Sequence, residues 1–520
     1  MEQITFNHHE SVFLADTKHT SYPTLEQDTH VDVAIIGGGI VGVTLAYLLK
    51  HSGQKVALFE ANRIAEGMTV KSTAKLTLQH HLIYDRLVHT KSPGRAKQYA
   101  DANNRAITFV KELVKKEHMD CDLVEVPSYV YTTKEENIKK IKDELEACKR
   151  LGIEMNYRED LPINLPIKAA LKWDGAALFH PRKYLLHLAD SFVEAGGKIY
   201  ENTRIQSVIP HKKGDKEEAI LETEEGKRVT TQKVVIASHF PIYDGMGLYF
   251  SRLNMRRVYV VAAKVKASDL PRGSFISVDE PKYSIRPVYE KKLVLIGGAE
   301  HRTGVDDKEL IHFEELRSFA NKVFHANQIE YYWSTQDYVT TDQMPYIGYL
   351  NSSLFQNLYV ATGFNKWGMT GGINAALVLR DMLLMGKSEY EELFNPKRTG
   401  AMSGPNFVTH NTEAVKNYLQ GKLRMVPKQE YPKKGEAVVT KLEDGNIYGI
   451  YQDEEENYHI VELTCPHVGA RLRWNSAEKS WDCPVHGSRF SIDGEILDGP
   501  STHRLNSYKE GKNQIHPNLY

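Results

Sequence analysis

The pattern of apolar and polar positions begins, after a polar stretch, with a compact alternation of strand and helix. Residues 31–36 form a short apolar run that is typical of a buried parallel strand. Residues 43–52 then predict a helix, which Gly53 closes, and residues 55–60 form a second apolar strand. Strand, helix and strand in this order predict the start of a parallel α/β sheet.

The next part of the chain predicts more elements of the same α/β domain. Residues 92–151 have apolar stripes at helical spacing and predict an amphipathic helical insertion, and a helix is predicted over 180–194. Alternating segments between about 245 and 340 predict an antiparallel sheet. A glycine-rich turn over 364–372 precedes a helix expected from Ile373 to Leu384. Further strands are predicted over residues 203–205, 233–238 and 357–363.

Changes in composition divide the chain into four parts. Residues 1–30 are polar and aperiodic and predict an N-terminal arm that lies on the next domain. Residues 31–390 form the α/β domain, and residues 391–434 form a polar linker with a short helix over 412–419. Residues 435–520 predict a small all-β domain. Its first strands are expected at 437–442, 447–451 and 459–463.

Composition and charge exclude several classes of protein. The 520 residues are 41% hydrophobic and 26% charged, as in ordinary soluble proteins, and the net charge is −1. This balance gives no electrostatic case for nucleic acid or an anionic membrane. Residues 33–49 lack charge, but the glycines among them argue against a membrane span. The four cysteines are too few for a disulfide framework, and no signal peptide is evident, so a reducing cytoplasm is expected.

A glycine motif joins the first strand to the first helix. Gly37, Gly39 and Gly42 match G-x-G-x-x-G, and Glu60 ends the second strand. In such a unit Gly37 allows the tight turn, Gly39 lets a pyrophosphate approach, and Gly42 lets the helix pack on the strand. An acid at the position of Glu60 accepts hydrogen bonds from a ribose hydroxyl. The motif predicts a dinucleotide site and leaves NAD and FAD open.

A second motif lies in the C-terminal domain. Cys465 and His467 form a C-x-H pair, and Cys483 and His486 form a C-x-x-H pair. Zinc sites usually pair Cys with Cys and His with His, whereas one Cys and one His per loop lets two thiolates hold one iron and two imidazoles the other. Residues 465–500 therefore resemble a Rieske [2Fe–2S] domain, including Gly-Ser after the second histidine and the closing Asp-Gly-Pro.

The ordered motifs of residues 31–388 resemble the D-amino-acid oxidase and glycine oxidase group of FAD-dependent oxidoreductases. The resemblance implies an α/β Rossmann-type FAD-binding domain, an antiparallel β substrate domain and a C-terminal Rieske domain. The segment Ala237-Ser238-His239 departs from this group, whose members commonly have a glycine close after the alanine, which leaves the geometry of this turn open. Residues 333–372 contain no Cys or His, so FAD is expected to bind non-covalently. The implied FAD contacts are Gly37, Gly38, Gly39, Gly42, Glu60, Ile205, Gly363, Gly368, Met369 and Thr370.

This combination predicts an FAD- and [2Fe–2S]-dependent oxidoreductase. A small amine or amino acid would reduce FAD, the Rieske cluster would remove the electrons singly, and a one-electron acceptor protein would receive them. The alternative is an electron-transfer or redox-sensing protein reduced by a protein partner or NAD(P)H, although no second dinucleotide motif follows a strand. A Rieske oxygenase is set aside because the histidines lack the spacing of a mononuclear iron site. Arg286 is a candidate carboxylate clamp, with a surface or inter-strand ion pair as the alternative. The resemblance places Lys75 and Trp367 near the flavin ring, either as catalytic residues or as residues that only shape the pocket.

The resemblance also predicts a low cluster potential. In high-potential Rieske proteins of respiratory complexes, two further cysteines bridge the loops and a tyrosine donates a hydrogen bond to a ligand sulfur. Ala470, Val485 and Phe490 occupy the corresponding positions here, and Ser488 alone keeps a hydroxyl. Fewer donors to sulfur stabilise the reduced cluster less.

Overall fold

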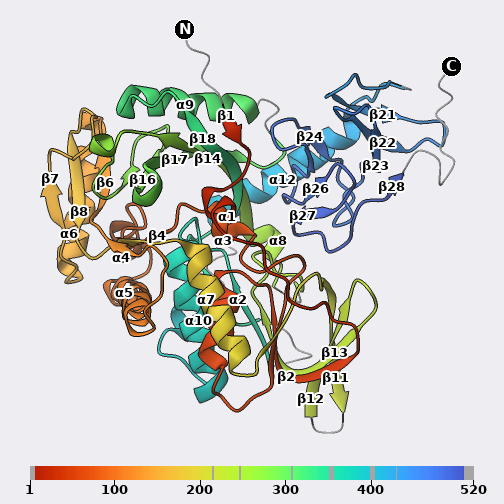
Figure 1. Cartoon of the computed structure of the whole chain (residues 1–520), viewed down its shortest axis with the longest axis horizontal. Helices are drawn as coiled ribbons and strands as arrows, with labels where there is room; N and C mark the ends of the chain where they lie inside the picture. Colours follow the sequence, from red (N-terminus) through yellow and green to blue (C-terminus); the bar gives the residue numbers. More distant parts are fainter. Residues whose placement is uncertain are drawn as a thin grey trace.

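The computed structural model describes residues 6–213, 216–244, 247–305, 309–350, 357–398, 404–428 and 430–508. Residues 1–5 of the predicted arm and 509–520 of the predicted C-terminal domain lie outside the described residues. Figure 1 shows the dinucleotide fold below, a large sheet with helix α9 (Glu309–Phe324) above it, and the C-terminal domain to one side. Within the described ranges, every helix is too short or too polar to cross a membrane.

The dinucleotide fold is built on a mostly parallel sheet. β3 (Val56–Phe59) lies beside β2 (Thr29–Ile36), and β2 lies beside β13 (Arg228–Ile236), all three in parallel. β10 (Lys198–Tyr200) extends this sheet beyond β3, and β20 (Leu358–Thr362) pairs with β13. Since β2 and β3 are buried apolar runs, the sheet is covered on both faces, as the sequence predicts.

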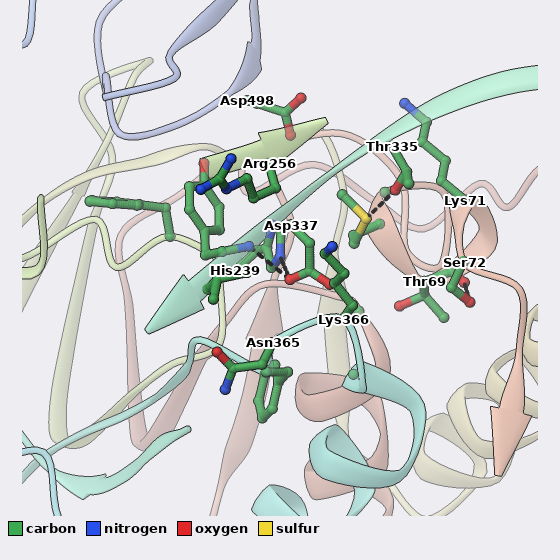
Figure 2. A pocket seen from close by; sticks show the side chains of 18 of the residues that line it. Thr69, Lys71, Ser72, His239, Arg256, Thr335, Asp337, Asn365, Lys366 and Asp498 are labelled. Carbon is green, nitrogen blue, oxygen red and sulfur yellow. Dashed lines mark hydrogen bonds and ion pairs between the residues drawn. The ribbon is translucent and has the colours of Figure 1, made fainter. Parts of the chain in front are cut away.

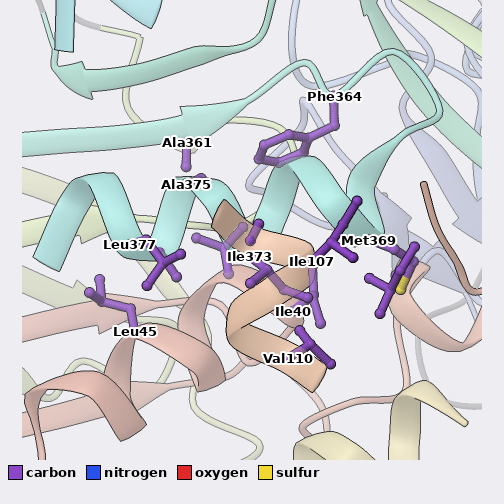
Figure 3. Packing of buried hydrophobic residues seen from close by; sticks show 14 of the residues in the cluster. Ile40, Leu45, Ile107, Val110, Ala361, Phe364, Met369, Ile373, Ala375 and Leu377 are labelled. Carbon is purple, nitrogen blue, oxygen red and sulfur yellow. The ribbon is translucent and has the colours of Figure 1, made fainter. Parts of the chain in front are cut away.

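Three helices pack together beside this sheet. α2 (Ile40–Leu49) contacts both α7 (Pro181–Glu194) and α10 (Gly368–Met385). Figure 3 shows Ile40 of α2 and Ile373 of α10 in the core that they share with α5 (Pro93–Lys116). α10 begins five residues before the predicted Ile373. The glycines there read as a turn, but a Cβ on Gly372 would lie 2.7 Å from the Ile40 side chain, so glycine serves close helix packing.

The substrate sheet is larger than the predicted range of 245–340. Its nine strands run in the order β1-β18-β14-β17-β16-β15-β6-β8-β7. The later strands are β14 (Leu253–Lys264), β15 (Ser274–Ser277), β16 (Ser284–Val288), β17 (Leu293–Arg302) and β18 (Ile329–Thr340). The added strands are β1 (Phe6–His8), β6 (Ser128–Thr132), β7 (Asn156–Arg158) and β8 (Ala169–Trp173).

The expectation of helix throughout 92–151 was wrong in its middle. α5 and α6 (Ile138–Arg150) are helices, but β6 lies between them in the sheet. All five residues of β6 are buried, so the strand has no alternation of apolar and polar positions that would mark it in the sequence.

The N-terminal arm is part of the fold. β1 pairs in parallel with β18, so that Phe6 lies opposite Ile329. Beyond the strand, the His9 ring lies 3.2 Å from the Glu478 carboxylate of the C-terminal domain. The arm therefore reaches both the substrate sheet and the C-terminal domain.

Among the residues that the structure describes, the C-terminal part contains one long helix and two small antiparallel sheets. α12 (Pro405–Leu423) is longer than the predicted helix at 412–419. β21 (Ala437–Lys441), β22 (Ile447–Gln452) and β23 (Tyr458–Glu462) match the predicted strands, and β28 (Ser507–Tyr508) joins their sheet. The second sheet contains β24 (Arg473–Asn475), β25 (Ser480–Asp482), β26 (Arg489–Ser491) and β27 (Ile496–Asp498). The two Cys/His pairs lie on loops at the ends of these strands, the first ligand loop (465–469) and the second ligand loop (483–487).

Candidate active site and metal centre

The glycine turn after β2 has little room for side chains. Gly37 has a φ of +110°, and a Cβ on it would lie 2.5 Å from the Ala237 carbonyl oxygen. A Cβ on Gly42 would lie 1.9 Å from the Gly37 carbonyl oxygen, which no substitution can accommodate without a backbone shift. Gly39 differs, because a Cβ there would meet only the Thr69 hydroxyl at 3.4 Å. Gly37 and Gly42 thus serve the fold, while Gly39 leaves space beside the cavity.

Glu60 lies at the end of β3, where the motif requires an acid. Its carboxylate accepts hydrogen bonds from the backbone N–H groups of Gly38 (2.7 Å) and Asn62 (2.9 Å). Burial raises the pKa of this carboxyl, although these bonds and nearby Arg204 oppose the shift. Both carboxylate oxygens keep further lone pairs, which suits them to ribose hydroxyls.

A cavity of about 1080 Å³ runs from the glycine turn to the substrate sheet. Figure 2 shows His239 and Asp337 facing one another inside it, with Asp498 of the C-terminal domain beyond Arg256. The predicted site residues that line it are Gly37, Gly38, Gly39, Glu60, Lys75, Ile205, Trp367, Gly368 and Met369.

Gly42, Gly363 and Thr370 do not line the cavity among the described residues and act from behind it. Gly363 has a φ of +72°, and a Cβ on it would lie 2.3 Å from the Thr340 side chain. The Thr370 hydroxyl lies 3.2 Å from the Thr77 backbone nitrogen, from which it accepts a hydrogen bond. These contacts hold α10 and the loop after β4 (Lys75–Leu76) in place.

Lys75 lies in the cavity wall with 8% of its surface exposed. Its ammonium donates a hydrogen bond to the Ser284 hydroxyl of β16. Burial, together with the nearby Arg286 cation, lowers the pKa of Lys75 to about 7. A lysine of this kind can exchange a proton near neutral pH.

Arg286 has a structural role, which corrects the carboxylate clamp proposed from the sequence. Its Nη1 donates to the carbonyl oxygens of Thr73 (3.2 Å), Ala74 (3.0 Å) and Phe179 (3.3 Å), and its Nε donates to that of Pro287 (2.9 Å). Among the described residues, Arg286 is not one of those that line the cavity. Arg286 was mistaken for a ligand residue because its partners, as far as 213 positions away, are main-chain groups that sequence patterns do not reveal.

Trp367 forms part of an aromatic wall with a histidine that sequence reasoning missed. The His80 ring stacks on Trp367 with centroids 4.7 Å apart, and its Nδ1 lies 2.6 Å from the Tyr99 hydroxyl. Burial lowers the pKa of His80 to about 3, so the ring stays neutral. The only signal in the sequence was its position five residues after the candidate residue Lys75.

His239 shows how the chain turns after Ala237 without the glycine that is common there in the resembled group. It has a φ of +64°, so a histidine takes the left-handed backbone that glycine adopts readily. Its ring packs on Tyr338 at 4.6 Å and lies 3.5 Å from the Asp337 carboxylate. These side-chain contacts offset the conformational penalty, and they add a polar pair to the cavity that the sequence did not predict.

The four predicted metal ligands converge in the C-terminal domain. Cys465 and Cys483 are buried and their thiols hydrogen-bond to one another. The His467 and His486 rings lie 5.0 Å apart, and the Nδ1 atom of each is buried without a hydrogen-bond partner. Two thiols and two unpaired imidazole nitrogens are the donor set of a Rieske [2Fe–2S] centre, so these residues fit the cluster.

The contact between the two thiols shifts their pKa values in opposite directions. The hydrogen bond from Cys483 lowers the pKa of Cys465 to about 7, and the Ser488 hydroxyl also lowers it. The same contact, together with burial, raises the pKa of Cys483. Ser488 is thus the hydroxyl donor to a ligand sulfur that the sequence predicted to remain.

The second ligand loop is held by the flavin domain. Arg302 of β17 donates to the Val485 carbonyl oxygen at 2.8 Å, and Gln336 of β18 donates to that of Gly487 at 2.8 Å. The loop backbone also packs closely on a side chain of β14, since a Cβ on Gly487 would lie 2.5 Å from the Met255 side chain. From the other side, Asn417 of α12 donates to the Pro484 carbonyl oxygen at 3.2 Å. The loop is thereby fixed between the substrate sheet and α12.

The fold and the two sites define a flavoprotein with its own iron–sulfur domain. Residues 32–382 match the family model for FAD dependent oxidoreductase, and residues 422–509 match that for the Rieske [2Fe-2S] domain. The chain belongs to the FAD-dependent oxidoreductase family and carries a C-terminal Rieske domain, so FAD and a [2Fe–2S] cluster are its cofactors.

Relatives include one with the same arrangement over nearly the whole chain. A Bacillus subtilis protein named as a Rieske 2Fe-2S iron–sulfur protein, YhfW, is 39% identical over 95% of this chain and 96% of its own length. Gamma-glutamylputrescine oxidoreductase of Escherichia coli is 23% identical over 72% of this chain and 89% of its own. The glycine oxidase structure from Geobacillus kaustophilus shares the fold, with a TM-score of 0.59 and 20% identity over 71% of this chain and 99% of that one.

Proposed function

We propose that this oxidoreductase dehydrogenates a small amine or amino acid and passes the electrons singly through its Rieske domain to an external one-electron acceptor protein. FAD supplies the chemistry that joins these halves, because it accepts a hydride equivalent and can release single electrons. The observation that carries the proposal is that one cavity is lined both by the glycine turn and by the Rieske residues around Asp498. The names of the glycine oxidase and gamma-glutamylputrescine oxidoreductase relatives support the substrate class.

The surroundings of the two histidine ligands support electron transfer from the flavin domain to the cluster through the His486 side. His486 is 7% exposed and lies under Phe250 of the flavin domain, with ring centroids 5.3 Å apart. His467 is only half-buried and lies farther from Phe250, at 6.0 Å. We assign His486 to the side that faces the flavin domain and His467 to the side that faces the acceptor.

Lys75 is the residue we favour for proton transfer. An amine substrate is mostly protonated at neutral pH and must lose a proton before it can donate a hydride equivalent. Lys75 lies in the cavity wall, its pKa is lowered to about 7, and Ser284 holds its ammonium. We propose that the neutral Lys75 amine takes this proton and that Trp367 shapes the pocket beside it.

An anaerobic panel of amines and amino acids tests the proposal. We expect one class to bleach the flavin absorbance of the intact protein and to bring up the signal of the reduced cluster in the same sample. In Cys483→Ser, supplied with excess FAD, the flavin should still bleach, but one-electron acceptors should no longer be reduced at the parent rate. Full turnover of that variant with such acceptors would place the cluster off the path.

The alternative, a redox protein reduced by a protein partner or NAD(P)H, makes the opposite prediction. No small molecule of the panel would then bleach the flavin, whereas NAD(P)H or a reduced carrier protein would. A Cys483→Ser flavin that no longer responds to the reductant would place electron entry at the cluster.

Three further properties are part of the proposal. We propose domain boundaries at residues 31–390 and 435–520, with a linker between them, and a cytoplasmic location without nucleic acid partners.

We also propose that FAD is held non-covalently. His81 lines the cavity and its Nε2 has no partner, so it is the place to look for a covalent link. Acid precipitation should release all flavin; a yellow pellet that turns colourless in His81→Gln would refute this.

A further inference from the structure

We infer that the Rieske domain contributes part of the FAD-binding site: residues 496–504, the wall segment, close the adenosine-pyrophosphate half of the cavity, so that FAD binding and Rieske docking stabilise each other. This role is independent of the substrate. It follows from where the segment lies and from two sets of contacts that join it to the dinucleotide motif.

The wall segment forms a continuous side of the cavity. Each residue from Ile496 to Thr502 lines it. Leu497 keeps 47% of its surface exposed, so the segment offers apolar surface as well as main-chain groups. The carboxylate of Asp498 would repel a pyrophosphate, but Arg489 pairs with it at 3.0 Å and offsets its charge. The segment can therefore lie beside an anionic cofactor.

The first set of contacts leads to the glycine turn. The Tyr338 hydroxyl donates to the Gly499 carbonyl oxygen at 2.9 Å. A Cβ on Gly499 would lie 3.3 Å from the Cβ of Phe240, so the two backbones are close. Phe240 follows Ala237, whose carbonyl oxygen lies against Gly37. Only one layer of chain thus separates the wall segment from the pyrophosphate turn.

The second set of contacts connects the wall segment to Glu60, the acid expected to bind the ribose, through residues of alternating charge. Arg504 donates to both oxygens of Glu224, with distances of 2.6 and 2.8 Å. Glu224 lies 3.8 Å from Arg204, and the Arg204 cation partly opposes the rise that burial causes in the pKa of Glu60. Both Arg204 and Glu60 line the cavity. The bidentate pair therefore attaches the Rieske domain to the part of the cavity wall where Glu60 would bind the ribose of FAD.

Mutual stabilisation follows from this geometry. A cofactor that contacts both the flavin domain and the wall segment binds the docked arrangement more tightly than an undocked one. By linkage, docking strengthens FAD binding by the factor by which FAD strengthens docking. The wall segment also closes that side of the cavity, so loosening it should speed the release of FAD.

Dissociation of FAD from the fully loaded protein measures this role. FAD fluorescence after dilution would give the release rate, while the EPR signal of the cluster reports that the Rieske domain is intact. Arg504→Glu should release FAD on the order of threefold to tenfold faster, since it replaces a bidentate pair with repulsion. Arg504→Lys keeps the charge but loses the bidentate geometry, so its release rate should lie between those of the parent and Arg504→Glu. Tyr338→Phe, which removes one hydroxyl, should also release FAD faster.

Arg228→Glu is the matched control. Arg228 pairs with Glu222 at 3.2 Å on the neighbouring strands, outside the wall segment, so its reversal should leave the release rate unchanged. Hydrogen exchange gives a second readout: residues 496–504 should be protected by FAD in the parent and less so in Arg504→Glu. The inference is overturned if Arg504→Glu and Tyr338→Phe, with intact clusters, release FAD like Arg228→Glu, or if FAD leaves exchange in 496–504 unchanged.

Discussion

The Gln336 side-chain nitrogen of the substrate sheet lies 2.8 Å from the Gly487 carbonyl oxygen of the second ligand loop. Gly487 follows His486, so one amide of the flavin domain fixes the backbone next to a cluster ligand. The Gln336 oxygen accepts a hydrogen bond from Thr303 at 2.7 Å, which orients the amide. The substrate sheet and the second ligand loop are thus joined by a fully buried and directed contact.

Gln336→Leu tests that contact. It leaves the Gly487 carbonyl and the Thr303 hydroxyl without partners, at about 1–3 kcal/mol for a buried group. We expect the ligand loop to loosen and the flavin-to-cluster electron transfer to slow, as seen by stopped-flow absorbance after substrate reduction. Gln328→Leu is the control, because Gln328 is exposed and directly precedes β18, the strand that carries Gln336. Equal rates in both variants would show that the contact does not govern the transfer.

Gly39→Ala and Gly42→Ala distinguish a glycine that leaves room for FAD from a glycine that the fold itself requires. Gly39→Ala should leave the apoprotein folded and lower FAD affinity about tenfold or more, because its methyl group occupies the approach of the pyrophosphate. Gly42→Ala should disturb the apoprotein itself, because its Cβ would lie 1.9 Å from the Gly37 carbonyl oxygen. Thermal unfolding without FAD and titration with FAD distinguish the two. Normal FAD binding by Gly42→Ala would contradict the packing argument.

Lys75 predicts a pH dependence of stability. Its pKa is about 7 in the folded protein and about 10.5 when unfolded, so the unfolded state binds more protons between these values. The free energy of unfolding of the parent should therefore rise with pH from about 7 to 10.5, relative to Lys75→Met, by up to about 1.4 kcal/mol per pH unit. Urea unfolding of both apoproteins at several pH values measures it. A difference that stays flat across this window would show that Lys75 is not buried as described.

Arg286→Met tests the corrected role of that residue. The substitution leaves carbonyl oxygens at Ala74 and Phe179 without their donor, and hydrogen bonds to a charged group contribute about 1.5–3 kcal/mol each. We expect a lower melting temperature and weaker FAD binding in the absence of substrate. If the variant had normal stability and only a raised KM for a carboxylate substrate, Arg286 would be a carboxylate-binding residue after all.

The cluster potential should lie toward the lower end of the Rieske range of about −150 to +300 mV. Ser488 is the hydroxyl donor to Cys465, and Ser488→Ala should make the potential more negative still, since it removes a bond that stabilises charge on sulfur. Redox titration followed by circular dichroism measures both proteins. A parent value near +300 mV would contradict the prediction.

Local motifs made much of this molecule predictable. The β2-turn-α2 unit and the ligand loops follow from residues close in sequence, where spacing and chemistry carry the signal. β6 was missed because complete burial removes periodicity, and Arg286 was misread because its partners are distant carbonyl groups. The Gln336 contact was also invisible, since its partner lies 151 positions away.

The parallel pairing of β1 with β18 has a consequence for synthesis. Phe6 leaves the ribosome long before its partner Ile329, and His9 meets Glu478 only when most of the Rieske domain has been made. Chains fold largely domain by domain as they emerge, at about 5–20 residues per second. The first strand therefore has to wait, unpaired, for on the order of half a minute, and the start of the chain is among the last parts to be secured.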